Sequence, residues 1–240
     1  MTHWRELVKE PIRNEADFLA FLSAVGICLW TPSKGLDFPN MEEASEFSEP
    51  TMMATWFWKD DLHNDKLLFY GKLLAGKSTF VSREFLPTLI ASYGDIDPYT
   101  LHEEGRLTAP ALRIYEALIE SQRLPTRDLR MQAKLSAKSD TTPFQNGLDQ
   151  LTALFQICKI DITGRTRGTY SYVWGLLEDW LPESLEIASQ LEPLASAQAV
   201  VDHLHRQGVT LSARQWRKHF VWSPLTYEKL VFPATMHATP

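Results

Sequence analysis

The stretch from Thr108 to Trp174 most constrains the fold, because its apolar pattern is helical three times in succession. The first helical segment begins at Thr108, with Pro110 in its opening turn. Thr126 opens the second segment and Thr142 the third. Threonine is a favourable residue immediately before a helix, and proline is tolerated in its first turn. The order predicts three short helices joined by tight connections.

A β-hairpin is predicted directly after these helices. Apolar and polar residues alternate over 158–162 and again over 169–174, as half-buried strands require. Between the two strands, residues 163–168 read Thr-Gly-Arg-Thr-Arg-Gly, a turn with a basic tip. Three helices followed by such a hairpin are the pattern of a winged helix-turn-helix unit.

The chain of 240 residues has room for two or three small domains. We expect an α+β fold, mainly α, with tandem winged helix-turn-helix units and small β-hairpins. Residues 1–104 are predicted to form a mixed α/β domain, which is open to interpretation as a degenerate winged helix. Residues 105–175 form the winged helix-turn-helix. Residues 176–240 form a helical C-terminal domain that resembles a truncated helix-turn-helix.

The charge distribution favours a nucleic-acid partner for the middle domain only. The whole chain has a formal charge of −6, yet residues 105–175 hold seven Arg and three Lys against six acidic residues. No apolar run is long enough to span a bilayer, and no secretory signal is visible. Cys28 and Cys158 have no partner motif, which suits free thiols in a reducing compartment. We therefore expect a cytoplasmic protein without membrane contact.

Candidate DNA-binding residues fall into three groups. Phosphates would meet cations on the second helix and the following turn: Arg127, Arg130, Lys134 and Lys138. Base edges would meet polar residues of the third helix: Thr141, Thr142, Gln145 and Asn146, with Asp149 on the same side. The hairpin tip would add Arg165 and Arg167. Because the third helix has no positive charge of its own, the pattern predicts weak, largely phosphate-driven binding to double-stranded DNA.

Two other patterns have features of functional sites. Gly71–Ser78 matches the phosphate-loop pattern GxxxxGK[ST], in which Lys77 would contact phosphate. Its interior is bulky and apolar, and residues 67–74 fit one face of a helix, so coincidence is favoured. Asp95, Asp97 and His102 lie in a predicted loop without a third converging ligand. We expect neither a metal nor another cofactor.

Several short segments are similar to one family. They are ELVKEPIR (6–13), GICLW (26–30), FYGKLL (69–74), TFVS (79–82), RIYEAL (113–118), LPTRDL (124–129) and VW (173–174). Together they resemble AlkZ-related winged-helix proteins, relatives of the bacterial DNA-crosslink repair glycosylases, over roughly residues 5–225. The resemblance implies tandem winged helices and DNA binding. Those glycosylases use a Gln-x-Gln or Gln-x-Asp pair to position water, and this sequence contains no such pair.

These observations leave several hypotheses open. The favoured one is a non-catalytic, winged-helix DNA-binding protein related to DNA repair. An interaction scaffold that binds a protein partner or a second copy of the chain is the alternative. A glycosylase that uses Asp95 or Asp97 in place of the missing glutamines is a third, and a nucleotide hydrolase acting through Lys77 is a fourth.

Overall fold

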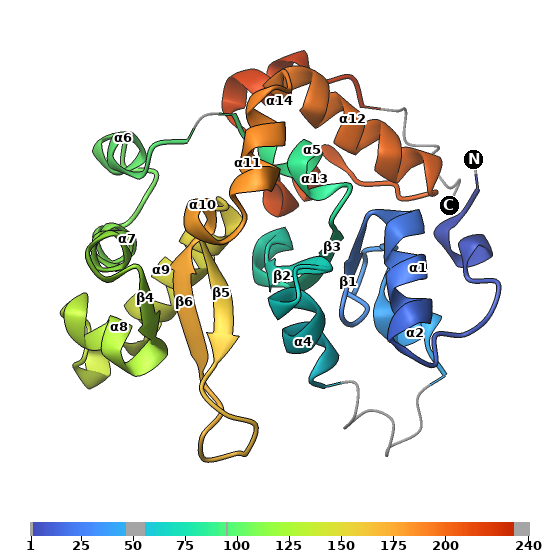
Figure 1. Cartoon of the computed structure of the whole chain (residues 1–240). Coiled ribbons are helices and arrows are strands. Elements are labelled where there is room, and N and C mark those ends of the chain that lie inside the picture. The colour runs from blue at the N-terminus through green and yellow to red at the C-terminus, as the bar shows by residue number, and fades with distance from the viewer. Residues whose placement is uncertain (1, 47–55, 95, 233–240) are drawn as a thin grey trace.

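The computed structural model describes residues 2–46, 56–94 and 96–232. Two small three-stranded antiparallel sheets lie side by side, with helices around them (Figure 1). The expected α+β architecture, in which helices predominate, is confirmed. Among the described residues, no helix is long and apolar enough to cross a membrane.

The first unit is built around the sheet with strand order β1-β3-β2. Its elements are η1 (Trp4–Leu7), α1 (Glu15–Val25), β1 (Ile27–Leu29), α2 (Met41–Ala44), α4 (Trp58–Asn64), β2 (Leu68–Lys72), η2 (Leu74–Gly76) and β3 (Ser78–Ser82). Cys28 of β1 and Tyr70 of β2 both pair with Phe80 of β3. The helix expected over residues 67–74 was wrong. Leu68, Phe69 and Tyr70 are all buried, so this apolar run is a strand covered on both faces.

The second unit follows after α5 (Leu86–Ala91) and α6 (Pro98–Glu103). Its elements are α7 (Ala109–Ser121), β4 (Arg123–Pro125), α8 (Thr126–Gln132), η3 (Lys138–Asp140), α9 (Thr141–Ala153), β5 (Ile157–Ile162) and β6 (Tyr172–Leu176). The three expected helices and the hairpin are therefore present. The short strand β4 was not expected; it pairs with β6 and gives the strand order β4-β6-β5.

The elements of the two units follow one another in the same order. In each, a helix leads into a short strand, further helices follow, and a two-stranded hairpin closes the sheet. In each sheet the first strand pairs with the last, and the middle strand lies at the opposite edge. The two units are alike in the order and pairing of their elements, whereas their residue patterns show no evident repeat.

The threonines expected to cap helices α7 and α8 have a different role. Thr108 Oγ1 donates to Gln150 Oε1 of α9 at 2.9 Å, and its side chain makes no capping hydrogen bond. Thr126 Oγ1 donates to the carbonyl of Tyr172 at 3.0 Å and accepts from Trp174 Nε1 at 3.0 Å. Both side chains therefore tie helices to neighbouring elements and so fix the geometry of the second unit.

The C-terminal helices pack on α5 and on the first unit, except the first of them, which lies against β5 and β6 (Figure 1). They are α10 (Leu177–Trp180), α11 (Pro182–Ser189), α12 (Pro193–Arg206), α13 (Ala213–His219) and α14 (Pro224–Lys229). One buried cluster runs from Trp4 to Ala91 and continues with residues from Phe155 to Leu230. A second cluster is confined to residues between Leu101 and Leu176. The middle unit thus has its own core, while the chain on either side of it shares another.

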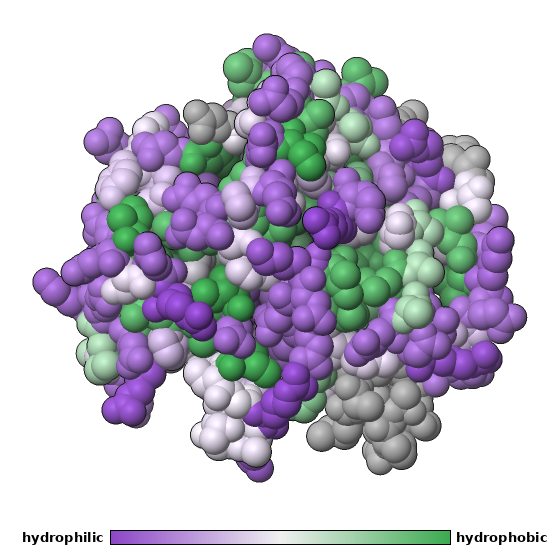
Figure 2. Space-filling model, viewed as in Figure 1, coloured by the Kyte–Doolittle hydropathy of each residue, from purple (hydrophilic) through white to green (hydrophobic). Residues whose placement is uncertain are grey.

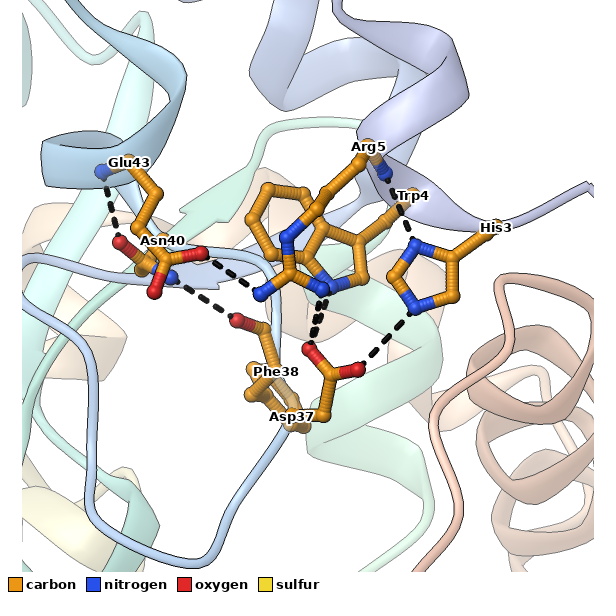
Figure 3. A network of polar contacts seen from close by, with 7 residues as sticks. All are labelled: His3, Trp4, Arg5, Asp37, Phe38, Asn40 and Glu43. Carbon is orange, nitrogen blue, oxygen red and sulfur yellow. Dashed lines mark hydrogen bonds and ion pairs between the residues drawn. The ribbon is translucent and has the colours of Figure 1, made fainter.

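A polar network fastens η1 to the loop that follows β1 (Figure 3). Asp37 accepts hydrogen bonds from Arg5 Nη1 at 2.7 Å and from Trp4 Nε1 at 3.2 Å, and His3 Nε2 lies 3.1 Å from its second oxygen. The other terminal nitrogen of Arg5 pairs with Glu43 at 2.7 Å. Burial raises the pKa of Asp37, but the hydrogen bonds from Arg5, Trp4 and His3 outweigh it, so the net direction is down.

Candidate nucleic-acid interface

The four predicted phosphate-binding cations lie on α8 and on the turn that joins α8 to α9, as expected. Arg127 is exposed in the first turn of α8, and Lys134 and Lys138 are exposed on the turn. Within the part of the chain that the structure describes, these three side chains form no ion pair or hydrogen bond. Their charges are therefore available to an external anion.

Arg130 is engaged inside the protein. Its guanidinium donates to the carbonyls of Leu135 at 3.1 Å and Ala137 at 3.3 Å. It also lies over the Phe144 ring, 5.4 Å from the centroid. These contacts hold the α8–α9 turn closed against the first turn of α9. Arg130 therefore shapes the predicted interface and has little freedom to reach a phosphate.

Helix α9 is exposed at its N-terminal end and covered towards its C-terminal end. Thr141, Thr142, Gln145 and Asn146 are all exposed. Asp149, one turn further on, accepts from Gln145 Nε2 at 2.7 Å and lies 3.7 Å from Lys72 Nζ of β2. The hairpin of the first unit packs against this half of α9, so Asp149 is only partly exposed, and its position facing a DNA groove stays a prediction.

Gly147, in the middle of α9, allows the close approach of α7. An added Cβ would lie 2.8 Å from Ile114 Cδ1 and 3.1 Å from the backbone nitrogen of Ala111. Glycine costs a helix about 1 kcal/mol relative to alanine. Here that cost is offset by packing that no larger residue permits. A glycine in the middle of a predicted helix indicates this loss of helix stability, but only the structure shows the close packing that explains it.

The tip of the β5–β6 loop carries one paired and one unpaired arginine. Both terminal nitrogens of Arg165 contact the carboxylate of Asp61 in α4, and its guanidinium lies over the Phe57 ring. The sequence suggests few intramolecular partners for Arg165, yet the structure pairs it with Asp61. Arg167 is exposed, and no ion pair or hydrogen bond of its side chain occurs among the described residues. In Figure 2 this loop projects from the lower edge as pale residues, since threonine and glycine have intermediate hydropathy.

Behind the loop tip lies a buried polar cluster that the sequence did not predict. Lys59 Nζ lies 2.5 Å from Asp60 Oδ2 and 2.6 Å from the Tyr170 hydroxyl. The Tyr170 hydroxyl also lies 2.8 Å from Asp60 and 2.9 Å from the Tyr172 hydroxyl. Lys59 and Asp60 are 1% and 3% exposed. The cluster joins α4 of the first unit to the hairpin of the second. The sequence indicates only that Tyr170 and Tyr172, two positions apart in a predicted strand, lie on the same face.

Lys159 of β5 adds a second buried amine to this junction. Its Nζ lies 3.9 Å from the centroid of the Tyr172 ring and 4.4 Å from that of Tyr70. The alternation of β5 predicted an exposed Lys159, and this was wrong, because the polar face of β5 packs on the first unit. Burial lowers the pKa of Lys159 to about 7, and the positive charge of Lys59 adds to this effect.

His63 completes the junction as a neutral imidazole. Its Nδ1 accepts from the backbone N–H of Tyr70 at 3.0 Å, so the proton resides on Nε2, which donates to the carbonyl of Lys159 at 2.5 Å. Burial lowers the pKa of His63 to about 3. The imidazole therefore bridges β2 and β5 without carrying charge.

A pocket of about 410 Å³ opens beside this junction. Aromatic side chains form much of its wall, and Lys59 is one of the basic residues that line it. Its lining comprises Trp30, Thr31, Trp56, Lys59, Tyr70, Gly76, Lys77 and Ser78. The Trp30 and Trp56 rings meet edge to face, with centroids 5.8 Å apart. Such a pocket suits a compact polar ligand that an aromatic surface can contact.

The other predicted sites do not assemble. Gly71–Ser78 spans the β2–β3 connection, and a strand follows it where a phosphate loop requires a helix. Asp97 caps α6, where Oδ2 accepts from Thr100 N at 2.8 Å; the loop expected around it is a helix. Asp95 lies outside the described residues. Within the described ranges, no group of three or more His, Cys, Asp or Glu could hold a metal ion.

A family model described as AlkZ related matches residues 12–221. The chain belongs to the AlkZ-related family. The match covers both sheets and most of the C-terminal helices, so AlkZ-related membership applies to nearly the whole described architecture. It also links the chain to DNA-repair glycosylases. No curated protein and no solved structure matches the chain.

Proposed function

We propose that this protein is a non-catalytic DNA-binding protein related to DNA repair, acting on duplex DNA in the cytoplasm through weak, largely phosphate-driven contacts. The observation that carries the proposal is the surface formed by the α8–α9 turn and the first half of α9. There the unpaired cations Arg127, Lys134 and Lys138 accompany exposed Thr142 and Asn146. The free, buried thiols of both cysteines suit a reducing compartment.

The connectivity of the two units supports an interpretation as tandem winged helices. In that interpretation α9 is the helix that enters the major groove and the β5–β6 loop is the wing. Recognition helices read bases mainly with their N-terminal residues. This is the half of α9 that remains exposed, so packing of its C-terminal half on the first unit is compatible with groove entry.

The arrangement of charges supports weak rather than tight binding. The Arg165 guanidinium pairs with Asp61, and the Arg130 guanidinium donates to backbone carbonyls, so neither is free to contact a phosphate. Three unpaired cations remain on α8 and the following turn, and Arg167 remains at the loop tip. Each phosphate contact contributes about 0.9 to the dependence of log K on log salt concentration. A footprint of about four phosphates thus predicts modest, strongly salt-sensitive affinity.

Fluorescence anisotropy with a labelled duplex across a salt series tests the proposal. We expect the double variant Lys134→Gln/Lys138→Gln to bind more weakly and to lower the salt slope by about 1 for each lysine. Lys9→Gln/Lys34→Gln is the matched control, because it removes the same charge from exposed positions in the first unit. If both double variants lost the same DNA affinity, the effect would be explained by net charge alone, which would contradict the proposed interface.

The interaction scaffold remains the second candidate function, and the partial cover over α9 favours it. An α9 that packs on the hairpin of the first unit is less accessible than a typical recognition helix. This candidate predicts no duplex binding even at low salt, together with a stable dimer or complex. Sedimentation velocity on the same sample distinguishes the two functions.

A further inference from the structure

Two features distinguish Lys59 from an ordinary structural lysine. Lysine is almost never fully buried unless it is paired, and here the Lys59 side chain is 2% exposed beside Asp60. The same residue also lines the pocket of about 410 Å³. Its amine therefore lies out of bulk water but next to a space that a small molecule can enter.

The surroundings of Lys59 favour an amine that can lose its proton. Aromatic rings lie close on several sides, with centroids 4.7 Å (Trp56), 5.0 Å (Tyr170) and 5.6 Å (Tyr172) from Nζ. Burial lowers the pKa of Lys59, although the adjacent carboxylate of Asp60 opposes this. Lys159 is a second buried amine over the Tyr172 ring. Desolvation of a lysine in an apolar pocket is one of the ways in which proteins activate it as a carbonyl nucleophile.

We propose that Lys59 forms an imine with the aldehyde of an abasic deoxyribose, so that the pocket captures abasic sites in DNA covalently. The free amine of Lys59 attacks the C1′ carbonyl carbon and a C–N bond forms. Both amine protons pass to the carbonyl oxygen, which leaves as water. The step neither oxidises nor reduces either partner.

The pocket lining suits such a substrate. An abasic sugar has no base, and its size is well within the volume of the pocket. Lys77 and Ser78 lie at the same pocket and offer an ammonium group and a hydroxyl to a neighbouring phosphate. Trp30 and Trp56 provide apolar ring surface on the wall of the pocket. Asp60 and Tyr170 are positioning residues, since both hold the Lys59 amine in place.

The inference rests on the proposed DNA binding and adds a covalent step to it. The test incubates the full chain with an abasic-site duplex and sodium cyanoborohydride, which reduces an imine to a stable secondary amine. Mass spectrometry of the digested adduct then locates the modified lysine. We expect a single adduct on Lys59, lost in Lys59→Met and retained in Lys9→Met, which removes an exposed amine outside the pocket.

Peptide mapping of the wild-type protein keeps the test independent of how well Lys59→Met folds. A duplex with a tetrahydrofuran abasic analogue, which has no aldehyde, measures binding separately. If this duplex binds but the aldehyde-bearing duplex gives no adduct, or an adduct on surface lysines alone, the inference is wrong and the proposed function stands. If neither duplex binds, the proposed function itself fails. Free deoxyribose 5-phosphate, trapped in the same way, then tests the amine alone; its failure to modify Lys59 would overturn the imine chemistry.

Discussion

Both terminal nitrogens of the Arg165 guanidinium contact the carboxylate of Asp61, which joins the loop of one sheet to a helix of the other. The hydrogen bonds that Arg165 donates to Asp61 raise the pKa of the arginine. The arginine side chain is 57% exposed, so water screens the pair, and exposed pairs are typically worth 0 to about 1 kcal/mol. Its main effect is on the orientation of the guanidinium, which faces its own protein instead of an external phosphate.

Asp61→Asn is expected to increase affinity for duplex DNA a few-fold at low salt. The substitution frees Arg165 and removes a negative charge close to the loop tip. Asp65→Asn removes the same charge from an exposed position directly after α4 and serves as the control. Anisotropy titrations at two salt concentrations measure both. A gain of the same size in the two variants would mean that the ion pair has no specific effect.

Gly147→Ala is expected to destabilise the protein by about 1 to 3 kcal/mol. Alanine raises helix propensity by about 1 kcal/mol, but its Cβ would crowd the backbone of Ala111 in α7. Urea denaturation followed by circular dichroism gives the free energy of unfolding. Gly168→Ala is the control, because nothing lies within 4 Å of the added Cβ, and we expect a change below about 0.5 kcal/mol there. If the free energy of unfolding of Gly147→Ala were unchanged or higher, α7 and α9 would have to move apart without cost, and the explanation would be wrong.

The buried amine of Lys159 predicts a pH dependence of stability. Its pKa is about 7 in the folded state and about 10.4 in the unfolded chain, so between these values the unfolded state holds more protons. The free energy of unfolding therefore rises with pH across this window, by up to about 1.4 kcal/mol per pH unit for one proton. Lys159→Met should flatten this rise and stabilise the protein near neutral pH, whereas Lys9→Met should leave it unchanged. Urea titrations from pH 6.5 to 9.5 check the slope; an equally steep rise in Lys159→Met would assign it to another group.

Asp37→Asn is expected to loosen the attachment of η1. Because the pKa of Asp37 is lowered in the folded state, its contribution is present above the unfolded value of about 3.9 and is lost as pH falls through the folded value. The carboxylate is half exposed, so the loss at neutral pH should stay near or below about 1 kcal/mol. Thermal unfolding at pH 7 and pH 3 should show a larger difference from wild type at pH 7 than at pH 3. Glu46→Gln, which breaks a more exposed pair with Arg13, should have no measurable effect.

Local patterns in the sequence predicted the elements of the second unit well. The helical segments expected from Thr108, Thr126 and Thr142 are present as α7, α8 and α9, and the apolar stripe through Phe144, Leu148 and Leu151 is buried. These features depend on residues a few positions apart, which is what periodicity and caps report. Residues 67–74 were misassigned because a strand buried on both faces has no alternation to distinguish it from a helix.

The junction between the two sheets could not be predicted, because it depends on residues about a hundred positions apart. Lys59 and Tyr170, or His63 and the Lys159 carbonyl, meet only when both units are folded. For the same reason the sequence could not show that Asp61 pairs with Arg165. Exposure of the cations Arg127, Lys134 and Lys138 agrees with expectation, while their contact with DNA stays a prediction.

The division of the interior into two clusters has a consequence for synthesis on the ribosome. The cluster between Leu101 and Leu176 uses one continuous segment, so a nascent chain can complete it soon after that segment emerges. The other cluster combines Trp4 and Phe18 with Trp216 and Leu230, so its earliest parts wait for nearly the whole polypeptide. We expect residues 101–176 to acquire protease resistance first. Residues 4–91 should become resistant only after translation is almost finished.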